Sequence, residues 1–245
     1  MPTPAPPALS LCLAALALCA ATLPARAADR PAVVPDTLAQ RVVACASCHA
    51  RTDTNGAPVN DSYFPRIGGK PAGYLYNQMI NFRDGRRQYP LMTYMVDHLP
   101  EAYLREIAGH FAAQHLATPA PVAGAMPQGL LERGRQLVLR GDAALKVPAC
   151  IACHGDGLTG VAPAIPGLLG LPRDYVNAQF GAWRNKDRRA HAPDCMAQIA
   201  ERLTLADVSA ISTWLAAQPV APDARPASAI KRPLPLACGS APERQ

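Results

Sequence analysis

CASCH at residues 45–49 and CIACH at residues 150–154 are two copies of the pattern Cys-x-x-Cys-His. In this pattern two thiols form thioethers with the edge of a haem, and the adjacent histidine binds the haem iron. Zinc sites and thiol redox enzymes also use Cys-x-x-Cys, but paired zinc motifs lie within about 20 residues of each other. Here the motifs are far apart and both carry the histidine, so we predict two covalent haems c. The predicted attachment residues are Cys45, Cys48, Cys150 and Cys153, and the predicted axial histidines are His49 and His154.

The N-terminus has the features of a secretory signal. About fifteen apolar residues within the segment 8–23 precede ARA at 25–27, which is a small-x-small cleavage site. This run is too short to span a membrane, and no later segment is long and apolar enough. We therefore predict a signal peptide at 1–27, a periplasmic mature chain and no membrane span.

The charge of the chain says little about its partners. The sequence has 24 Lys and Arg against 18 Asp and Glu, a formal net charge of +6, and haem propionates would offset that excess. No segment resembles a nucleic-acid-binding motif. We predict no nucleic-acid partner.

Two cysteines remain once the signal and the haem motifs are set aside. The chain has eight cysteines, and those two are Cys195 and Cys238. In an oxidising compartment they can form a disulfide that fastens the C-terminal tail to the second half of the chain. The alternative is that Cys238 stays free or links two molecules.

The chain is an internal duplication. The segment 69–87 is matched by the segment 170–188, and the apolar residues of both segments recur at helical spacing. Each segment has a proline where the helix is expected to start. The matched pairs are Pro71 and Pro172, Tyr74 and Tyr175, Gln78 and Gln179, Phe82 and Trp183, Arg83 and Arg184, and Arg87 and Arg188.

Helices are expected throughout and no convincing alternating strand is found, so the predicted fold class is all-α. Each copy holds roughly 90 residues, few for a self-sufficient core, so we expect a small helical fold wrapped around its haem. Further helices are expected from about 36 to 45 and at 100–115, 128–140 and 204–218, the last with a Thr204–Asp207 capping box. The predicted divisions are a signal peptide at 1–27, domains at 28–116 and 128–218, a linker at 117–127 and a Pro-rich tail at 219–245.

The second axial ligand decides what each haem does. Met196 is the only methionine after the second motif, and it lies seven residues before Leu203 at the entrance to the closing helix. Met92 lies seven residues before Leu99 in the first copy, whereas Met95 lies only four before. The duplication therefore selects Met92 and Met196. His98 and His191 remain alternative ligands, and methionines that merely fill the core remain an alternative.

Each axial histidine also needs an acceptor for its second ring nitrogen. The backbone carbonyls of Pro65 and Pro166 are the candidates. Arg83 and Arg184 are weaker candidates for contacts with the haem propionates.

These motifs resemble the periplasmic dihaem cytochromes of the cytochrome c4 family, two class I cytochrome c domains in tandem. The resemblance covers about residues 36–218. It implies two facing domains with propionates near a shared interface, and iron ligation by the methionines that match Met92 and Met196. Two features depart from it, namely Cys195 directly before Met196 and the tail that holds Cys238.

The resemblance implies single-electron transfer rather than catalysis. The implied partners are a terminal oxidase, a membrane respiratory complex or a periplasmic dehydrogenase. The alternative function is a dihaem enzyme or a dehydrogenase cytochrome subunit with one catalytic haem, for peroxidase-like chemistry or the oxidation of sulfur compounds. That alternative predicts two domains that do not match at the ligands.

Overall fold

The protein is seen in a computed structural model that describes residues 36–59, 61–115, 117–121 and 126–241. Residues Thr37–Gln245 cluster into one compact unit. The predicted signal peptide at 1–27 lies outside the described residues, and the predicted linker lies partly outside them. The domain boundaries therefore stay predictions. No helix in the described part of the chain has the length and apolar character needed to cross a membrane.

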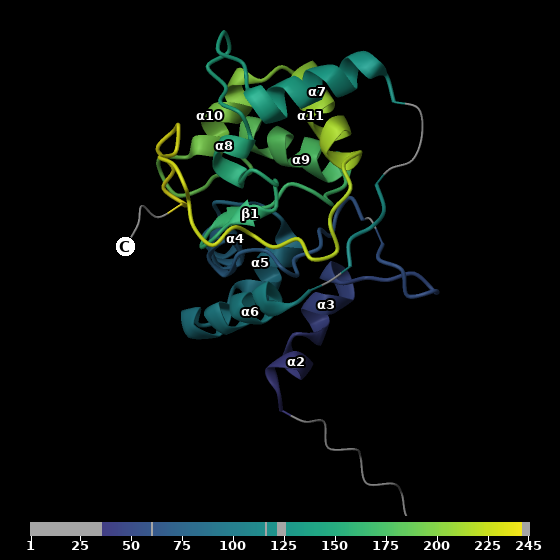
Figure 1. The fold of residues 1–245 in the computed structure, drawn as a ribbon. Coiled ribbons are helices and arrows are strands. Elements are labelled where there is room, and N and C mark those ends of the chain that lie inside the picture. Colours follow the sequence, from purple (N-terminus) through teal and green to yellow (C-terminus); the bar gives the residue numbers. More distant parts are fainter. Residues whose placement is uncertain (1–35, 60, 116, 122–125, 242–245) are drawn as a thin grey trace, which may run out of the picture. The chain divides into compact units, whose positions relative to one another are not determined.

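The described residues of the first copy form five helices (Figure 1). The helix expected from 36 to 45 is divided at Val42 into two short helices, and the Thr37 hydroxyl caps the first of them. The closing helix begins after Pro100, close to its expected start. The elements are α2 (Leu38–Arg41), α3 (Val43–His49), α4 (Ala72–Arg83), α5 (Pro90–Val96) and α6 (Glu101–Ala113).

The second copy repeats this order. Its first and closing helices have the expected positions, and the predicted capping box between Thr204 and Asp207 is confirmed. A two-residue antiparallel pair of strands, which the sequence did not predict, pairs Gly160 with Pro166 and Val161 with Ile165. The elements are α7 (Gln128–Arg140), α8 (Ile151–His154), β1 (Gly160–Val161), β2 (Ile165–Pro166), α9 (Arg173–Arg184), α10 (Cys195–Arg202) and α11 (Leu205–Ala216).

The structure corrects the expected position of the two methionines. Met92 and Met196 do not lie at the entrance to the closing helices α6 and α11. Each lies in a separate short helix before the closing helix, Met92 in α5 and Met196 in α10. A short helix at this place holds the side chain more firmly than a loop, because its backbone is hydrogen-bonded.

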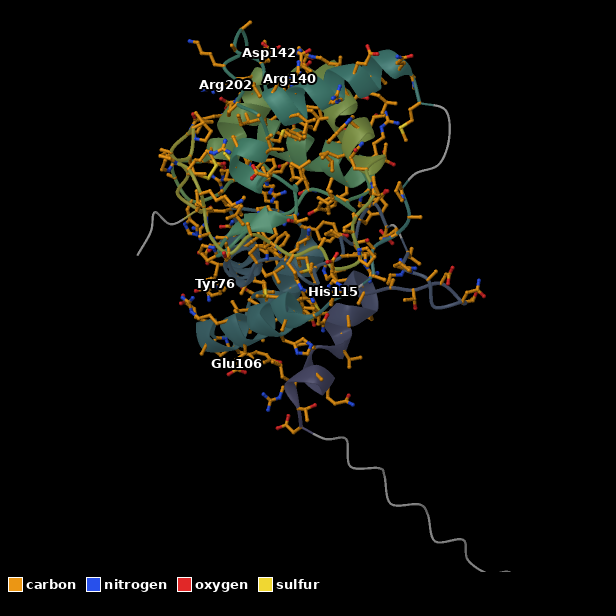
Figure 2. The ribbon with its side chains drawn as sticks, in the orientation of Figure 1. Tyr76, Glu106, His115, Arg140, Asp142 and Arg202 are labelled. Carbon is orange, nitrogen blue, oxygen red and sulfur yellow. A yellow bond between two sulfur atoms is a disulfide. The ribbon has the colours of Figure 1, made fainter. Side chains whose placement is uncertain are left out.

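Each copy has its own hydrophobic core. In the first copy, buried residues such as Leu104 and Phe111 of α6 pack against α4. In the second copy, Leu137 of α7 and Leu215 of α11 are almost fully buried. Arg133 of α7 donates to Asp207, in the first turn of α11, at 2.8 Å. It also donates to Asp142 at 2.9 Å. Figure 2 shows Asp142 just past the end of α7.

Helices α7 and α11 cross closely at Gly134. A Cβ atom at Gly134 would lie 2.2 Å from the carbonyl oxygen of Ala210. We expect Gly134→Ala to lower the free energy of unfolding by about 1–3 kcal/mol, the usual cost of overpacking a core. Urea denaturation of the holoprotein measures it. Gly129→Ala is the matched control, since Gly129 lies on the same helix with nothing within 4 Å; an equal loss in both variants would contradict the prediction.

The tail runs back over the second copy. Figure 1 shows it, in yellow, passing beside β1. Ala227 forms two backbone hydrogen bonds there, to Gly160 at 2.9 Å and from Ala162 at 2.7 Å. Cys195 and Cys238 form a disulfide with an S–S distance of 2.06 Å. The tail is thus attached to the second copy by backbone hydrogen bonds and by a covalent bond.

Candidate haem site

Both Cys-x-x-Cys-His motifs open onto one largely apolar cavity. The motifs place their histidines in short helical segments, α3 and α8, so that thiols and imidazole face the same space. The cavity is lined by Cys45, Cys48, His49, Cys150, Cys153 and His154, and also by Met92, Met95 and Met196. The structure therefore brings together the side chains that the sequence singled out.

Each histidine is held by a backbone carbonyl of a later loop. Nδ1 of His49 lies 2.7 Å from the carbonyl oxygen of Pro65, and Nδ1 of His154 lies 2.8 Å from that of Pro166. A carbonyl only accepts, so Nδ1 carries the proton and Nε2 keeps its lone pair for a metal. Burial lowers the pKa of both imidazoles, which favours the neutral form that a metal requires.

The strand pair that the sequence did not predict holds the loop that binds His154. Strand β2 ends at Pro166, and its pairing with β1 fixes the direction of the Pro166 carbonyl. Proline suits this position because it has no N–H to satisfy in the short ladder.

The cysteines of the motifs are not built for thiol catalysis. Burial raises the pKa of Cys150 to about 12, and burial also raises the pKa of Cys45 and Cys153. Reactive thiols need the opposite shift, because the thiolate is the nucleophile. Among the described residues, no group of three or more His, Cys, Asp or Glu side chains is placed to hold a metal ion. The raised thiol pKa values do not fit thiol catalysis, whereas attachment to a haem fits.

The alternative histidine ligands are less suitably placed than the methionines. The side chain of His98 is 93% exposed, and neither His98 nor His191 lines the cavity. Met196 is the second residue of α10, and Met92 is the third residue of α5. Met95 also lines the cavity, one turn further along α5, so the geometry by itself admits both methionines of the first copy.

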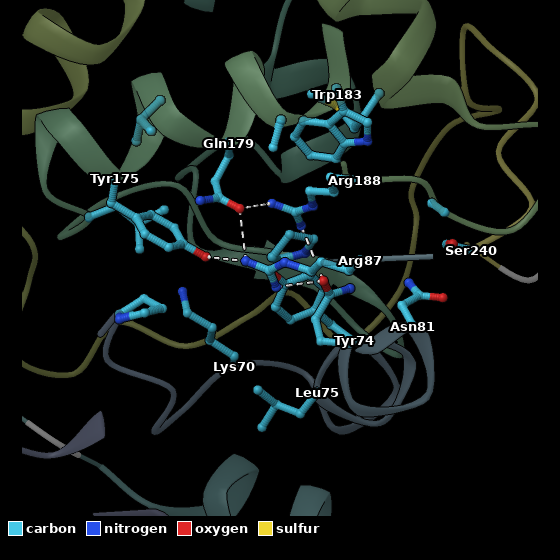
Figure 3. Close-up of a pocket in the computed structure, with 18 of the residues that line it drawn as sticks. Lys70, Tyr74, Leu75, Asn81, Arg87, Tyr175, Gln179, Trp183, Arg188 and Ser240 are labelled. Atoms are coloured by element: carbon cyan, nitrogen blue, oxygen red, sulfur yellow. Dashed lines mark hydrogen bonds between the residues drawn. The ribbon is translucent and has the colours of Figure 1, made fainter. Parts of the chain in front are cut away.

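A cluster of cationic side chains lies between the two copies (Figure 3). Arg87 donates to Gln78 at 2.9 Å and to Gln179 at 2.8 Å. Arg188 donates to the same two oxygens, to Gln179 at 2.6 Å and to Gln78 at 3.2 Å. The two arginines also pair through their backbones. Two guanidinium groups thus share two amide oxygens across the duplication.

This cluster has an excess of positive charge. Arg188 is only 7% exposed, and Lys70 also lines the cavity. Burial lowers the pKa of Lys70 and of Arg188, and the neighbouring charge of Arg87 lowers that of Arg188 further. In the described ranges no carboxylate forms an ion pair with any of the three. Buried charges normally have partners, and haem propionates are carboxylates of the required charge.

Arg83 and Arg184, the arginines expected from the sequence to contact the propionates, have other partners. Arg83 pairs with Asp84 and Glu101, Arg184 donates to the carbonyl of Leu203 at 2.7 Å, and neither lines the cavity. They lie on the matched helices but face away from it. The pairing of Arg87 with Arg188 in the duplication was the signal that pointed to the other arginines.

Several curated relatives match most of the chain. A protein of Thiomonas intermedia (strain K12) described as a thiosulfate dehydrogenase electron acceptor is 35% identical over 181 residues, which are 73% of this chain and 80% of that protein. A cytochrome c4 of Pseudomonas aeruginosa is 30% identical over 177 residues, which are 71% of this chain and 84% of that protein. No family model matches the chain.

Several solved structures share the fold. Reduced recombinant cytochrome c4 from Pseudomonas stutzeri has a TM-score of 0.60 and 25% identity, over 73% of this chain and 95% of that one. The thiosulfate dehydrogenase TsdBA from Marichromatium purpuratum has a TM-score of 0.62 and 28% identity over 71% of this chain. This chain spans only 36% of the TsdBA chain.

The duplicated motifs, the shared cavity and these relatives agree on fold, cofactor and role. The fold is two class I cytochrome c domains in tandem, mostly helical. The cofactor is two covalently bound haems c, and the role is electron transfer. The chain belongs to the cytochrome c4 family of dihaem cytochromes.

Proposed function

We propose that this chain is a periplasmic single-electron carrier in which His49 and Met92 bind one haem iron and His154 and Met196 bind the other. One observation supports this most strongly: both copies present the same donors to the cavity. In each, a histidine is bonded through Nδ1 to a proline carbonyl, and a methionine lies in the short helix before the closing helix.

Each group of residues has a separate task in this proposal. The four motif cysteines would attach the cofactor, and the histidine and methionine of each copy would bind its iron and leave no ligand position for a substrate. The bound haems supply a one-electron change at each iron. A thioether is a soft ligand that favours ferrous iron, so Met92 and Met196 raise the reduction potentials. Arg87, Arg188 and Lys70 counter the charge of the propionates.

We further propose that the electron donor is a dehydrogenase that oxidises a small sulfur compound, with thiosulfate as the first candidate. The support is the similarity to the Thiomonas protein, a thiosulfate dehydrogenase electron acceptor, and to part of TsdBA. Matched ligand sets in the two copies favour a carrier over an enzyme, because a catalytic haem needs an open axial position.

The test is to mix ferric holoprotein with a thiosulfate dehydrogenase and thiosulfate, and to follow haem reduction by stopped-flow absorbance. We expect reduction of both haems that requires the enzyme and the substrate together. Reduction by thiosulfate alone would identify the chain as the enzyme itself. No reduction with the complete mixture, in a protein whose haems dithionite reduces, would eliminate this donor but leave the carrier role.

A further inference from the structure

The disulfide lies directly beside the proposed methionine ligand of the second haem. Cys195 is the first residue of α10, and Met196 is the second. Its partner Cys238 lies 43 positions later in the chain. In the first copy the residue before Met92 is Leu91, which is 47% exposed. This fastening is therefore a property of the second copy alone.

The tail also packs on the segment that leads into Met196. The N–H of Gly239 donates to the carbonyl of Pro193 at 2.9 Å, and the N–H of His191 donates to the hydroxyl of Ser240 at 3.3 Å. A Cβ atom at Gly239 would lie 2.2 Å from the carbonyl oxygen of Ala192. Only glycine fits at this close approach, so the tail packs directly on the backbone of the segment 191–194.

The same tail reaches the histidine side of the second haem site. Ala241 is 4% exposed and packs with Val161 and Ile165 of the strand pair. That pair ends at Pro166, whose carbonyl accepts from His154. With the backbone bonds of Ala227 to Gly160 and Ala162, the tail connects the loop that holds His154 with the segment that leads into Met196. Its cavity-lining residues are Leu234, Leu236, Cys238, Ser240 and Ala241, and Figure 3 shows Ser240 at this edge of the cavity.

We propose that the C-terminal tail is a strap that positions Met196, with the Cys195–Cys238 disulfide as its fastening. This inference rests on the proposed ligation by Met196. A methionine at the first turn of a short helix keeps its place only if the preceding loop is ordered. The crosslink reduces the freedom of that loop and of the tail together. Met196 therefore leaves its place less often than it would without the strap, so the second haem site is closed to external ligands.

The test is the rate at which cyanide binds to the ferric holoprotein, followed by absorbance, because cyanide can bind only when the methionine has left the iron. A Met196→Ala variant identifies the kinetic phase of the second haem, which becomes fast. In the double variant C195S/C238S, which leaves no stray thiol, we expect this phase to be at least about tenfold faster than in the native protein, equivalent to about 1.4 kcal/mol. The phase of the first haem is the internal control and is expected to be unchanged.

A second variant tests the packing of the tail separately from the disulfide. Gly239→Val keeps both cysteines but places side-chain atoms against the Ala192 carbonyl, and non-reducing peptide mapping verifies the disulfide. We expect the second-haem phase to accelerate here as well.

Three outcomes overturn the strap. They are unchanged cyanide binding in C195S/C238S, equal acceleration at both haems, which would indicate general loosening, and no acceleration in Gly239→Val. If Met196→Ala itself changes neither phase, the ligand assignment fails, and the strap fails with it.

Discussion

Replacing Met196 by alanine is expected to lower the reduction potential of one haem and leave the other unchanged. The soft thioether stabilises ferrous iron, so its loss lowers the reduction potential. The drop is expected to be on the order of 0.1 V or more, within the roughly 0.8 V range over which axial ligands act. An optical redox titration of the holoprotein measures it. The ferric methionine-to-iron charge-transfer band is expected to fall to about half, because one of two haems loses its ligand.

The first copy supplies a matched pair of variants. Met92 and Met95 lie one turn apart on α5 and both line the cavity, but only Met92 matches Met196 in the duplication. Met92→Ala is expected to lower the potential of the first haem and to halve the charge-transfer band. Met95→Ala is expected to leave that potential and the band unchanged. The opposite result would assign Met95 as the ligand. An unchanged band in Met196→Ala would place that methionine in the core.

Removing the charge of Arg188 is expected to lower the potentials of both haems together. Arg188 shares its two amide acceptors with Arg87, so the charge lies between the two haem sites rather than in one. Reduction makes a haem less positive. A nearby cation therefore favours the reduced state and raises the potential. A unit charge acting over about 10 Å at an effective dielectric constant of about 20 contributes about 1.7 kcal/mol, which is roughly 70 mV for one electron.

The controls for this prediction separate charge from position. Arg188→Gln is the test, Arg188→Lys keeps the charge, and Arg184→Gln removes the same charge from a residue that does not line the cavity. Redox titration is expected to show the drop in both haems only in Arg188→Gln. A drop confined to one haem would show that the cluster does not serve both sites, and an equal drop in Arg184→Gln would show a nonspecific charge effect.

Much of this protein could be predicted from short-range patterns. The Cys-x-x-Cys-His motifs predicted the haems because their chemistry needs only neighbouring residues. The fixed offset of the duplication predicted matched helices, and α7 and the capping box of α11 lie where the sequence placed them. Helical periodicity is local, and it is visible in any window of a dozen residues.

The remaining features required contacts between distant residues. Val42 divides the first helix, and the paired strands orient the Pro166 carbonyl, although neither is marked by a strong local pattern. The sequence left Cys238 free, intermolecular or bonded to Cys195, and the course of the tail decided it. Arg87 and Arg188 line the cavity and Arg83 and Arg184 do not, and this depended on the course of the chain after α4 and α9 end.

The sequence by itself determined the cofactor, the duplication and the helical class of this protein, because covalent motifs and helical periodicity are properties of neighbouring residues. Only the tertiary structure decided where the cations gather and how the tail crosses the second haem site. These features bring together residues far apart in the sequence, such as Arg87 with Gln179, 92 positions apart, and Asn77 with Ser240, 163 positions apart. Such contacts form where packing closes long loops, and no local pattern encodes that closure.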